Sequence, residues 1–262
     1  MILRPTADGG GIIIAQPAHA WVSAQFARAW GGASTGVPRL DEALILAIEQ
    51  HDIGWHALDR APLRDPATGR PYDFLTLPRP LHTALWSDGV ATAEAVYGAE
   101  VALLISRHGR AVYALTPDEA RSAEDRAAIA RFRAEQDALE ARLRPKVAHD
   151  DAALAERARL LFLFDLLSLV ACGAFGEGEK RAPPARLAAA DVRLQLRFRT
   201  EPNRLEIDPW PFRKARFEVG CRARRLSTIT FPDEEVMRIA LREAEEFDHR
   251  VLVVPAAPGA DG

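Results

Sequence analysis

The chain of 262 residues contains only two cysteines, Cys172 and Cys221, and each lies in an apolar stretch. Two cysteines cannot form a disulfide framework or a zinc site built from cysteines, and so sparse a use of thiols is typical of a reducing compartment. The sequence therefore predicts a cytoplasmic protein whose fold depends on a hydrophobic core.

Long hydrophobic runs and an excess of one charge are also missing. The longest apolar stretch, residues 160–174, is interrupted by Asp165 and is too short to cross a bilayer. Residues 12–15 are too few for the core of a signal peptide. The formal net charge is −3, with 27% charged and 48% hydrophobic residues, which gives no general basic surface for nucleic acid. We expect neither a membrane nor a nucleic-acid partner, and the sequence does not indicate an oligomeric state.

The first two thirds of the chain show helical periodicity. After a short strand at 12–15, apolar spacing and start signals predict helices at about 17–30, 40–51, 82–107, 117–144 and 150–173. The helix at 82–107 could break at Gly89 or Gly98. Residues 57–80 contain five prolines and four arginines and predict a long loop without regular structure.

After residue 173 the pattern changes to strands. Residues 173–184 are expected to be a linker, and apolar residues then alternate with polar ones over 192–199 and 216–223. Further strands are predicted at 226–231 and 250–254, with a helix at 233–247. The fold class is therefore α+β: a mainly helical domain over 1–175, a smaller antiparallel β-rich α+β appendage over 186–255, and a disordered tail over 256–262.

The adjacent pair His51-Asp52 closes an apolar helix and predicts a metal site. His51 lies three residues after Ile48 and seven after Leu44, so it shares their buried face. Asp52 lies four residues after Ile48 and points the same way. An imidazole and a carboxylate that face a core must be paired, hydrogen-bonded or bound to a metal.

The same pattern recurs elsewhere in the helical region. His19 shares a face with Val22 and Phe26, and His108 ends an apolar helix. Asp165 interrupts a helix that is apolar almost all round, where an unpaired carboxylate would cost several kcal/mol, roughly the penalty for an isolated buried charge. Including a histidine at a helix start, the candidate metal ligands are His19, His51, Asp52, His82, His108 and Asp165.

Two interpretations of this set are open. It could be a network of ordinary buried hydrogen bonds, or it could hold one or two divalent transition metals. Imidazole and carboxylate ligands suit iron, manganese, nickel or zinc better than calcium.

The ordered ligand set resembles the HD-domain superfamily of metal-dependent phosphohydrolases. There a helical bundle supplies a histidine, an adjacent His-Asp pair and a distant helical aspartate. The segment His51-Asp52-Ile53-Gly54 is similar to the "HD-I-G" form of cyclic-dinucleotide phosphodiesterases. The resemblance covers residues 12–173. It implies a first metal held by His19, His51, Asp52 and Asp165, and a second that His82 and His108 hold or approach.

A closer resemblance is to an uncharacterised bacterial family within that superfamily. It rests on Gln16-Pro17-Ala18-His19, His51-Asp52-Ile53-Gly54-Trp55-His56, Ser106-Arg107-His108 and Asp208-Pro209-Trp210-Pro211-Phe212. No reaction is assigned to that family, so function has to come from the site. The chain departs from the phosphodiesterase branch at Trp55, where a lysine is expected, and at Gly109, where a second histidine is expected. Specificity for cyclic dinucleotides is therefore not implied.

These features predict a metal-dependent phosphohydrolase or phosphodiesterase acting on a small anionic phosphoester. In this hypothesis Arg107 holds the phosphate through its guanidinium, and His56 acts as an acid or base. A surface arginine and a structural histidine are the other interpretations of these two residues. An HD-type di-iron oxygenase and a non-catalytic metal-binding or sensing module are the alternative functions. The loop 57–80 is expected to cover the metal cleft, unless it is a surface excursion.

Overall fold

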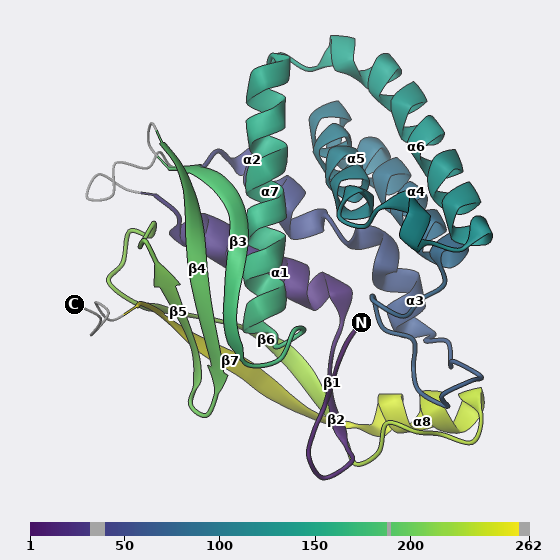
Figure 1. Cartoon of the computed structure of the whole chain (residues 1–262). Coiled ribbons are helices and arrows are strands. Elements are labelled where there is room, and N and C mark those ends of the chain that lie inside the picture. The colour runs from purple at the N-terminus through teal and green to yellow at the C-terminus, as the bar shows by residue number, and fades with distance from the viewer. Residues whose placement is uncertain (32–39, 188–189, 257–262) are drawn as a thin grey trace.

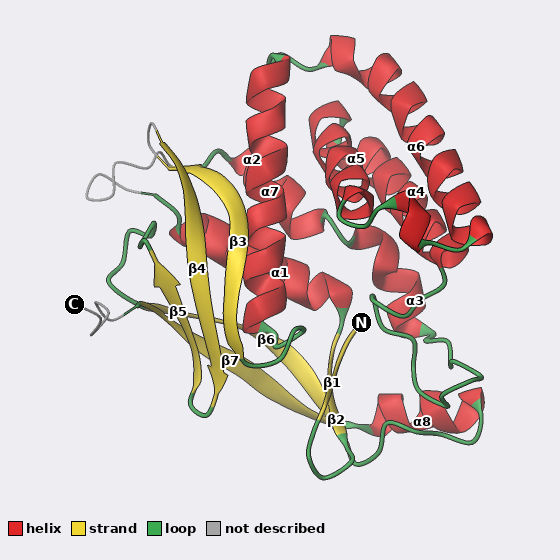
Figure 2. Cartoon of the chain, in the orientation of Figure 1, coloured by secondary structure: helices red, strands yellow, loops and turns green. Residues whose placement is uncertain are grey.

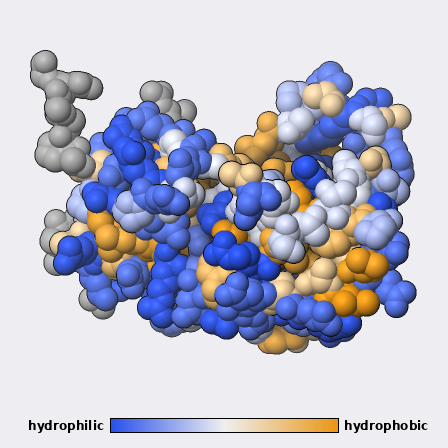
Figure 3. All heavy atoms as spheres, turned by 90° about the horizontal axis from the view of Figure 1, so that it is seen from below, coloured by the Kyte–Doolittle hydropathy of each residue, from blue (hydrophilic) through white to orange (hydrophobic). Residues whose placement is uncertain are grey.

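A computed structural model of the chain describes residues 1–31, 40–187 and 190–256. The predicted disordered tail falls almost entirely on residues 257–262, which lie outside the described residues. Within the described ranges, no helix is both long and apolar enough to cross a membrane. On the face shown in Figure 3, hydrophilic residues are interspersed with smaller hydrophobic groups.

The helices form one side of the molecule, and a sheet curls along the other (Figures 1 and 2). In chain order the helical elements are α1 (Gln16–Ala29), α2 (Glu42–Gln50), the 3₁₀ turn η1 (Ile53–Trp55), α3 (His56–Arg60), α4 (Arg79–Tyr97), α5 (Ala99–Ala114), η2 (Asp118–Ala120), α6 (Ala123–Leu143), η3 (Arg144–Lys146) and α7 (Asp151–Ala171). The predicted helices are present, although the one predicted at 117–144 begins at Ala123 and the one predicted at 82–107 continues to Ala114. The predicted break in the latter falls at Gly98, whose φ of 89° suits glycine.

The strands build a single seven-stranded sheet. They are β1 (Ile2–Pro5), β2 (Gly11–Ile14), β3 (Gly178–Leu187), β4 (Ala190–Thr200), β5 (Asn203–Asp208), β6 (Phe217–Leu226) and β7 (Glu245–Pro255), with α8 (Glu234–Glu243) before the last. Their spatial order is β1-β2-β6-β7-β5-β4-β3. The predicted α+β class is therefore confirmed.

The sheet is mixed, so the prediction of an antiparallel region was wrong in this detail. Strands β5 and β7 pair in parallel, while the other neighbouring pairs are antiparallel. The reason is topological. Strand β7 inserts between β5 and β6, which run in opposite directions, so it must be parallel to one of them.

Several predicted boundaries in this region were also wrong. The expected linker at 173–184 contains the start of β3, which pairs with β4 despite its prolines and glycines. The predicted helix at 233–247 ends at Glu243, and β7 begins two residues later. Residues 227–231 form no strand. For β3 and β7, pairing with a neighbouring strand decided the structure, and local composition does not show that pairing.

The sheet takes strands from both ends of the chain. Strands β1 and β2 pair with each other, and β2 pairs with β6, so the N-terminal residues extend the C-terminal sheet. The predicted division into residues 1–175 and 186–255 stays a prediction. The two sides share one main core, because α1 packs on β6 and α7 packs on β3 and β4.

The segment 208–212 docks the sheet onto the helices. Phe212 is buried and makes edge contacts with Trp30 at 5.6 Å and tilted contacts with Phe26 at 5.9 Å. The backbone N–H of Gly31 donates to the carbonyl of Pro211 at 3.0 Å. These contacts fix the end of α1 against the sheet.

Glycines set how closely the end of α2 approaches α4. A Cβ added at Gly54 would lie 2.0 Å from the Leu85 carbonyl oxygen and 2.9 Å from the Gly89 nitrogen. Only glycine at position 54 lets the turn η1 lie directly on the backbone of α4. This contact positions His51 and Asp52, which immediately precede η1.

Asp41 joins the start of α2 to α7. Its carboxylate accepts a hydrogen bond from the Leu44 N–H at 2.9 Å and pairs with the Arg157 guanidinium. The hydrogen bond from Arg157 lowers the pKa of Asp41 from 3.8 to about 2.

We expect Asp41→Ala to lower the free energy of unfolding by about 1–2 kcal/mol, the usual cost of losing an N-cap. Asp41→Asn keeps the cap and should cost less, as urea denaturation would measure.

The charge of Asp41 also predicts a pH dependence. Because folding depresses the pKa, the contribution of the carboxylate is complete above the unfolded value of 3.8 and is lost as the pH falls through about 2. The stability difference between the parent and Asp41→Asn should therefore shrink over that window. A difference that stayed constant throughout it would show that the charged pair with Arg157 adds nothing to stability.

Candidate metal centre

Four helices bring five of the predicted ligands together. His19 comes from α1, His51 and Asp52 from the end of α2, His108 from α5 and Asp165 from α7. All five are buried. The helices that carry them contact one another pairwise around this point, since α1 packs on α2 and α7, and α5 packs on α2 and α7. The inward faces predicted from the apolar spacing are therefore confirmed for these residues.

The imidazoles surround the two carboxylates at short range. Nε2 of His19 lies 2.6 Å from Oδ2 of Asp52. Nε2 of His51 lies 3.5 Å from Oδ2 of Asp52 and 3.5 Å from Oδ1 of Asp165. Nε2 of His108 lies 3.2 Å from Oδ2 of Asp165. Both carboxylates are thus shared between rings from different helices.

Backbone and hydroxyl groups orient two of the rings. Nδ1 of His51 donates to the Ile48 carbonyl at 2.8 Å, so Nε2 is the nitrogen that faces the carboxylates. Nδ1 of His19 lies 2.7 Å from the Ser168 hydroxyl. That hydroxyl donates to the Asp165 carbonyl at 2.8 Å and so accepts from His19. A fixed second nitrogen is the usual arrangement of metal-ligating histidines.

Several inward nitrogens have no hydrogen-bond partner among the described residues. Nε2 of His51 and both ring nitrogens of His108 are buried and make no hydrogen bond there. Oxygens of Asp165 nevertheless lie 3.5 Å from Nε2 of His51 and 3.2 Å from Nε2 of His108. Buried polar atoms are rarely left unsatisfied. The unpaired Nε2 atoms of His51 and His108, which lie near carboxylate oxygens, are compatible with a shared cation.

The pKa shifts of the buried groups also indicate that positive charge is favoured between the carboxylates. Burial opposes ionisation of Asp165, but the imidazoles of His108 and His51 outweigh it and hold the pKa of Asp165 well below its usual range. Burial likewise disfavours a charged His51, yet Asp52 and Asp165 raise the pKa of His51 to about 9. Both carboxylates thus lie near the His51 ring and favour a positive charge there. A metal ion would supply the same compensation with a higher charge.

The described residues contain a group with the spacing of a metal site. Ligand atoms of His19, His51 and Asp165 all lie within 4.8 Å of one another, and all three residues are buried. This group could hold a metal ion. Asp52 and His108 border it through the contacts given above.

His82 is buried but is not brought to this group. Its Nδ1 shares a hydrogen bond with the Tyr113 hydroxyl, and its ring packs against Trp55 at 5.1 Å. Burial, aided by Arg79, lowers the pKa of His82 to about 3. Among the described residues, no ion pair links His82 to either carboxylate of the centre. Its role as a metal ligand stays a prediction.

Among the described residues, neither predicted catalytic residue forms a hydrogen bond or ion pair with the two carboxylates. His56 is exposed, because the turn η1 directs its neighbour Trp55 into the core instead. Arg107 is tied to Glu140 of α6 through Nε at 3.0 Å and through Nη2. Nη2 of Arg107 also lies 3.9 Å from Oδ1 of Asp151 at the start of α7. The phosphate-binding role of Arg107 has no support in these contacts.

The predicted loop 57–80 is not irregular throughout, because residues 57–60 belong to α3 and residues 79–80 belong to α4. The Arg64 guanidinium donates to the Phe231 carbonyl at 2.8 Å, and Arg79 donates to the Leu75 carbonyl within the same segment at 2.9 Å. The Phe74 N–H donates to the Met1 carbonyl at 3.1 Å. No hydrogen bond or ion pair among the described residues joins residues 61–78 to the centre. These contacts favour the surface excursion over the lid.

Sequence reasoning missed the hydroxyl groups that support the centre. Ser23 donates to Ser168, which contacts His19. Ser23 lies four residues after His19, and Ser168 lies three residues after Asp165, so both share a helix face with a predicted ligand. Polar residues at this spacing from a buried ligand are the signal that could have identified them.

The fold and the site together define an α+β protein with a buried imidazole–carboxylate centre. The chain belongs to the family described as "Protein of unknown function (DUF3891)", whose model matches residues 1–228. No curated protein and no solved structure gave a significant match to the chain.

Ligation by Asp165 can be separated from packing. A metal that binds the folded state raises the melting temperature. We expect manganese, iron, nickel or zinc to raise the melting temperature of the parent chain and to leave the melting temperature of Asp165→Asn unchanged. Asp151→Asn, on an exposed residue of the same helix, should keep the full response. If Asp165→Asn responded like the parent, Asp165 would be a structural hydrogen-bond acceptor.

Proposed function

We propose that the chain is a metal-dependent hydrolase of a phosphoester, related to the HD-domain superfamily. The observation that carries the proposal is the convergence of three imidazoles and two carboxylates from four helices on one buried point. In the sequence these residues follow the order His…His-Asp…His…Asp, which is the order that resembles the superfamily. The proposed cofactor is one or two divalent transition metals, which this ligand chemistry accommodates.

The proposed first set of ligands is His19, His51, Asp52 and Asp165. His108 adds a further nitrogen on the Asp165 side, and His82 is the remaining candidate for a second ion. When bound, the metal would polarise a phosphoryl oxygen and lower the pKa of a coordinated water. The chain's own residues fix the geometry. Ser168 orients His19, and the Ile48 carbonyl orients His51.

Access to the centre supports a small substrate. The side chain of Asp165 is 12% exposed, against 5% for Asp52 and 1% for His51. Solvent therefore reaches the group on the Asp165 side. Phe162 and Leu166 are half-buried on the same helix, and the Phe162 ring contacts that of His108 at 5.6 Å. We propose that a small anionic phosphoester with an apolar portion would approach the group from this side.

Two other functions share the same ligands. An HD-type di-iron oxygenase is favoured by the nitrogen- and oxygen-only ligand set, which suits iron. A metal-binding or sensing module without turnover is favoured by the near-complete burial of the centre.

One set of assays distinguishes these functions. We expect the metal-loaded chain to release nitrophenol from a nitrophenyl phosphate monoester or diester. Asp52→Asn should lose at least about 100-fold in kcat, the upper end of the loss usual for residues that only support metal ligands. Asp88→Asn, on the exposed face of α4, is the control. Oxygen uptake by an iron-loaded protein without phosphate release would favour the oxygenase. Bound metal with neither activity would favour the sensing module.

A further inference from the structure

The chain's two cysteines are 49 positions apart in the sequence and meet where α7 ends against the sheet. Cys172 directly follows α7 and is fully buried, and Cys221 lies on β6 and is half-buried. The neighbouring Cys221 thiol, together with burial, raises the pKa of Cys172. Cys221 also packs against the core cluster that contains Cys172.

The contacts of His249 also place the end of α7 beside the strand that carries Cys221. In the pairing of β6 with β7, His249 lies directly opposite Cys221, so the two side chains share one face of the sheet. Nε2 of His249 donates to the Ala171 carbonyl at 2.9 Å. Ala171 immediately precedes Cys172. The imidazole therefore ties the end of α7 to the strand pair that carries Cys221.

The second ring nitrogen of His249, Nδ1, can act as a base beside the cysteines. Because Nε2 carries the proton that bonds Ala171, Nδ1 of the neutral ring holds a lone pair. Burial lowers the pKa of His249, which favours this neutral form. Nδ1 is buried and has no hydrogen-bond partner among the described residues. It is available to accept a proton from a neighbouring thiol.

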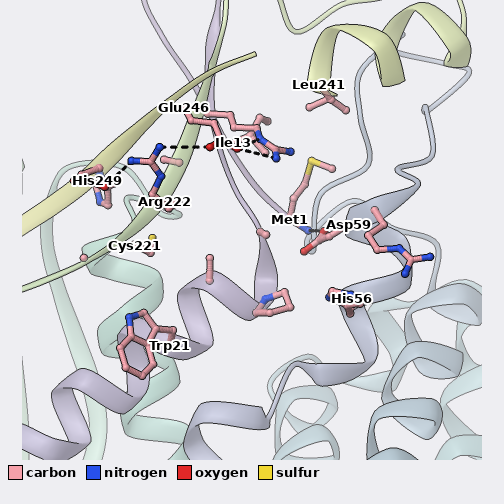
Figure 4. Close-up of a pocket in the computed structure, with 18 of the residues that line it drawn as sticks. Met1, Ile13, Trp21, His56, Asp59, Cys221, Arg222, Leu241, Glu246 and His249 are labelled. Carbon is pink, nitrogen blue, oxygen red and sulfur yellow. Dashed lines mark hydrogen bonds and ion pairs between the residues drawn. The ribbon is translucent and has the colours of Figure 1, made fainter. Parts of the chain in front are cut away.

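Only one of the two thiols faces a cleft. Cys221 and His249 line a cleft of about 1160 Å³ between β6, β7, α1, α3 and α8, whereas the buried Cys172 is not among its lining residues. Figure 4 shows Cys221 on the side of the cleft where His249 and Trp21 also lie. A small solute can therefore reach Cys221 while Cys172 stays protected. An accessible thiol backed by a second one is the usual arrangement of a redox-sensitive pair.

We propose that Cys172 and Cys221 form a redox-sensitive dithiol, which a peroxide entering the cleft converts to an intramolecular disulfide. The Cys221 sulfur attacks the peroxide, the O–O bond breaks, and Cys221 becomes a sulfenic acid with release of one water. The Cys172 sulfur then attacks the Cys221 sulfur. The S–S bond forms, the S–O bond breaks, and the Cys172 proton leaves with the hydroxide as a second water. Each cysteine loses one electron, and the peroxide gains two.

A second metal site at this place is the alternative, and the geometry does not favour it. Ligand atoms of Cys172, Cys221 and His249 do not form a group within 4.8 Å, whereas those of His19, His51 and Asp165 do, among the residues that the structure describes. The dithiol proposal does not depend on the proposed hydrolase. It does concern the same helix, because Cys172 follows Asp165 by seven residues, about two turns.

The test uses the full chain treated with hydrogen peroxide and then unfolded for thiol counting. We expect free thiols to fall from two to none and the intact mass to fall by two hydrogens. A digest should contain one peptide pair linked through Cys172 and Cys221, and dithiothreitol should restore both thiols.

Single variants complete the test. With Cys172→Ser, Cys221 should stop at a sulfenic acid that dimedone traps. With Cys221→Ser, Cys172 should remain free because it is buried. The proposal would be overturned if the parent chain gave Cys221 oxidised alone, a disulfide between two molecules, or two thiols that persist through treatment that oxidises free cysteine.

Discussion

The structure depends on the burial of two carboxylates among helices. Asp52 and Asp165 lie in the interior, and each is within 3.5 Å of Nε2 of His51. Charges of one sign in such a place are tolerated only when positive charge and hydrogen bonds compensate them. The rings of three histidines, the Ser168 hydroxyl and the close Gly54–Gly89 contact all serve to assemble that compensation. The packing of α1, α2, α5 and α7 therefore also brings the residues of the centre together.

Most of the helical half and most of the centre follow from the sequence. A polar residue at i+3, i+4 or i+7 from buried apolar residues must face inward, and this argument correctly placed His19, His51, Asp52, His108 and Asp165. It works because helical periodicity is local. The α+β class follows in the same way, since the change from helical to alternating spacing after residue 173 requires only neighbouring residues.

The features that could not be predicted depend on contacts between distant segments. Nothing near residue 245 shows that β7 inserts between β5 and β6, or that β2 extends the sheet through β6. Arg107 has a suitable position beside His108, but Glu140 of α6 occupies its guanidinium. Similarly, Cys172 and Cys221 each look like isolated apolar cysteines in the sequence, and only the docking of α7 on the sheet brings them together.

Elemental analysis of freshly purified protein would show whether the buried group holds a metal ion. We expect one or two transition-metal ions per chain, retained through gel filtration, with His51→Ala and Asp165→Asn both depleted. The exposed-site variant Asp151→Asn should match the parent. A parent chain that stays below one ion per molecule after repletion with iron, manganese, nickel and zinc would show that the group is not a metal site. The centre would then be a network of buried hydrogen bonds and ion pairs.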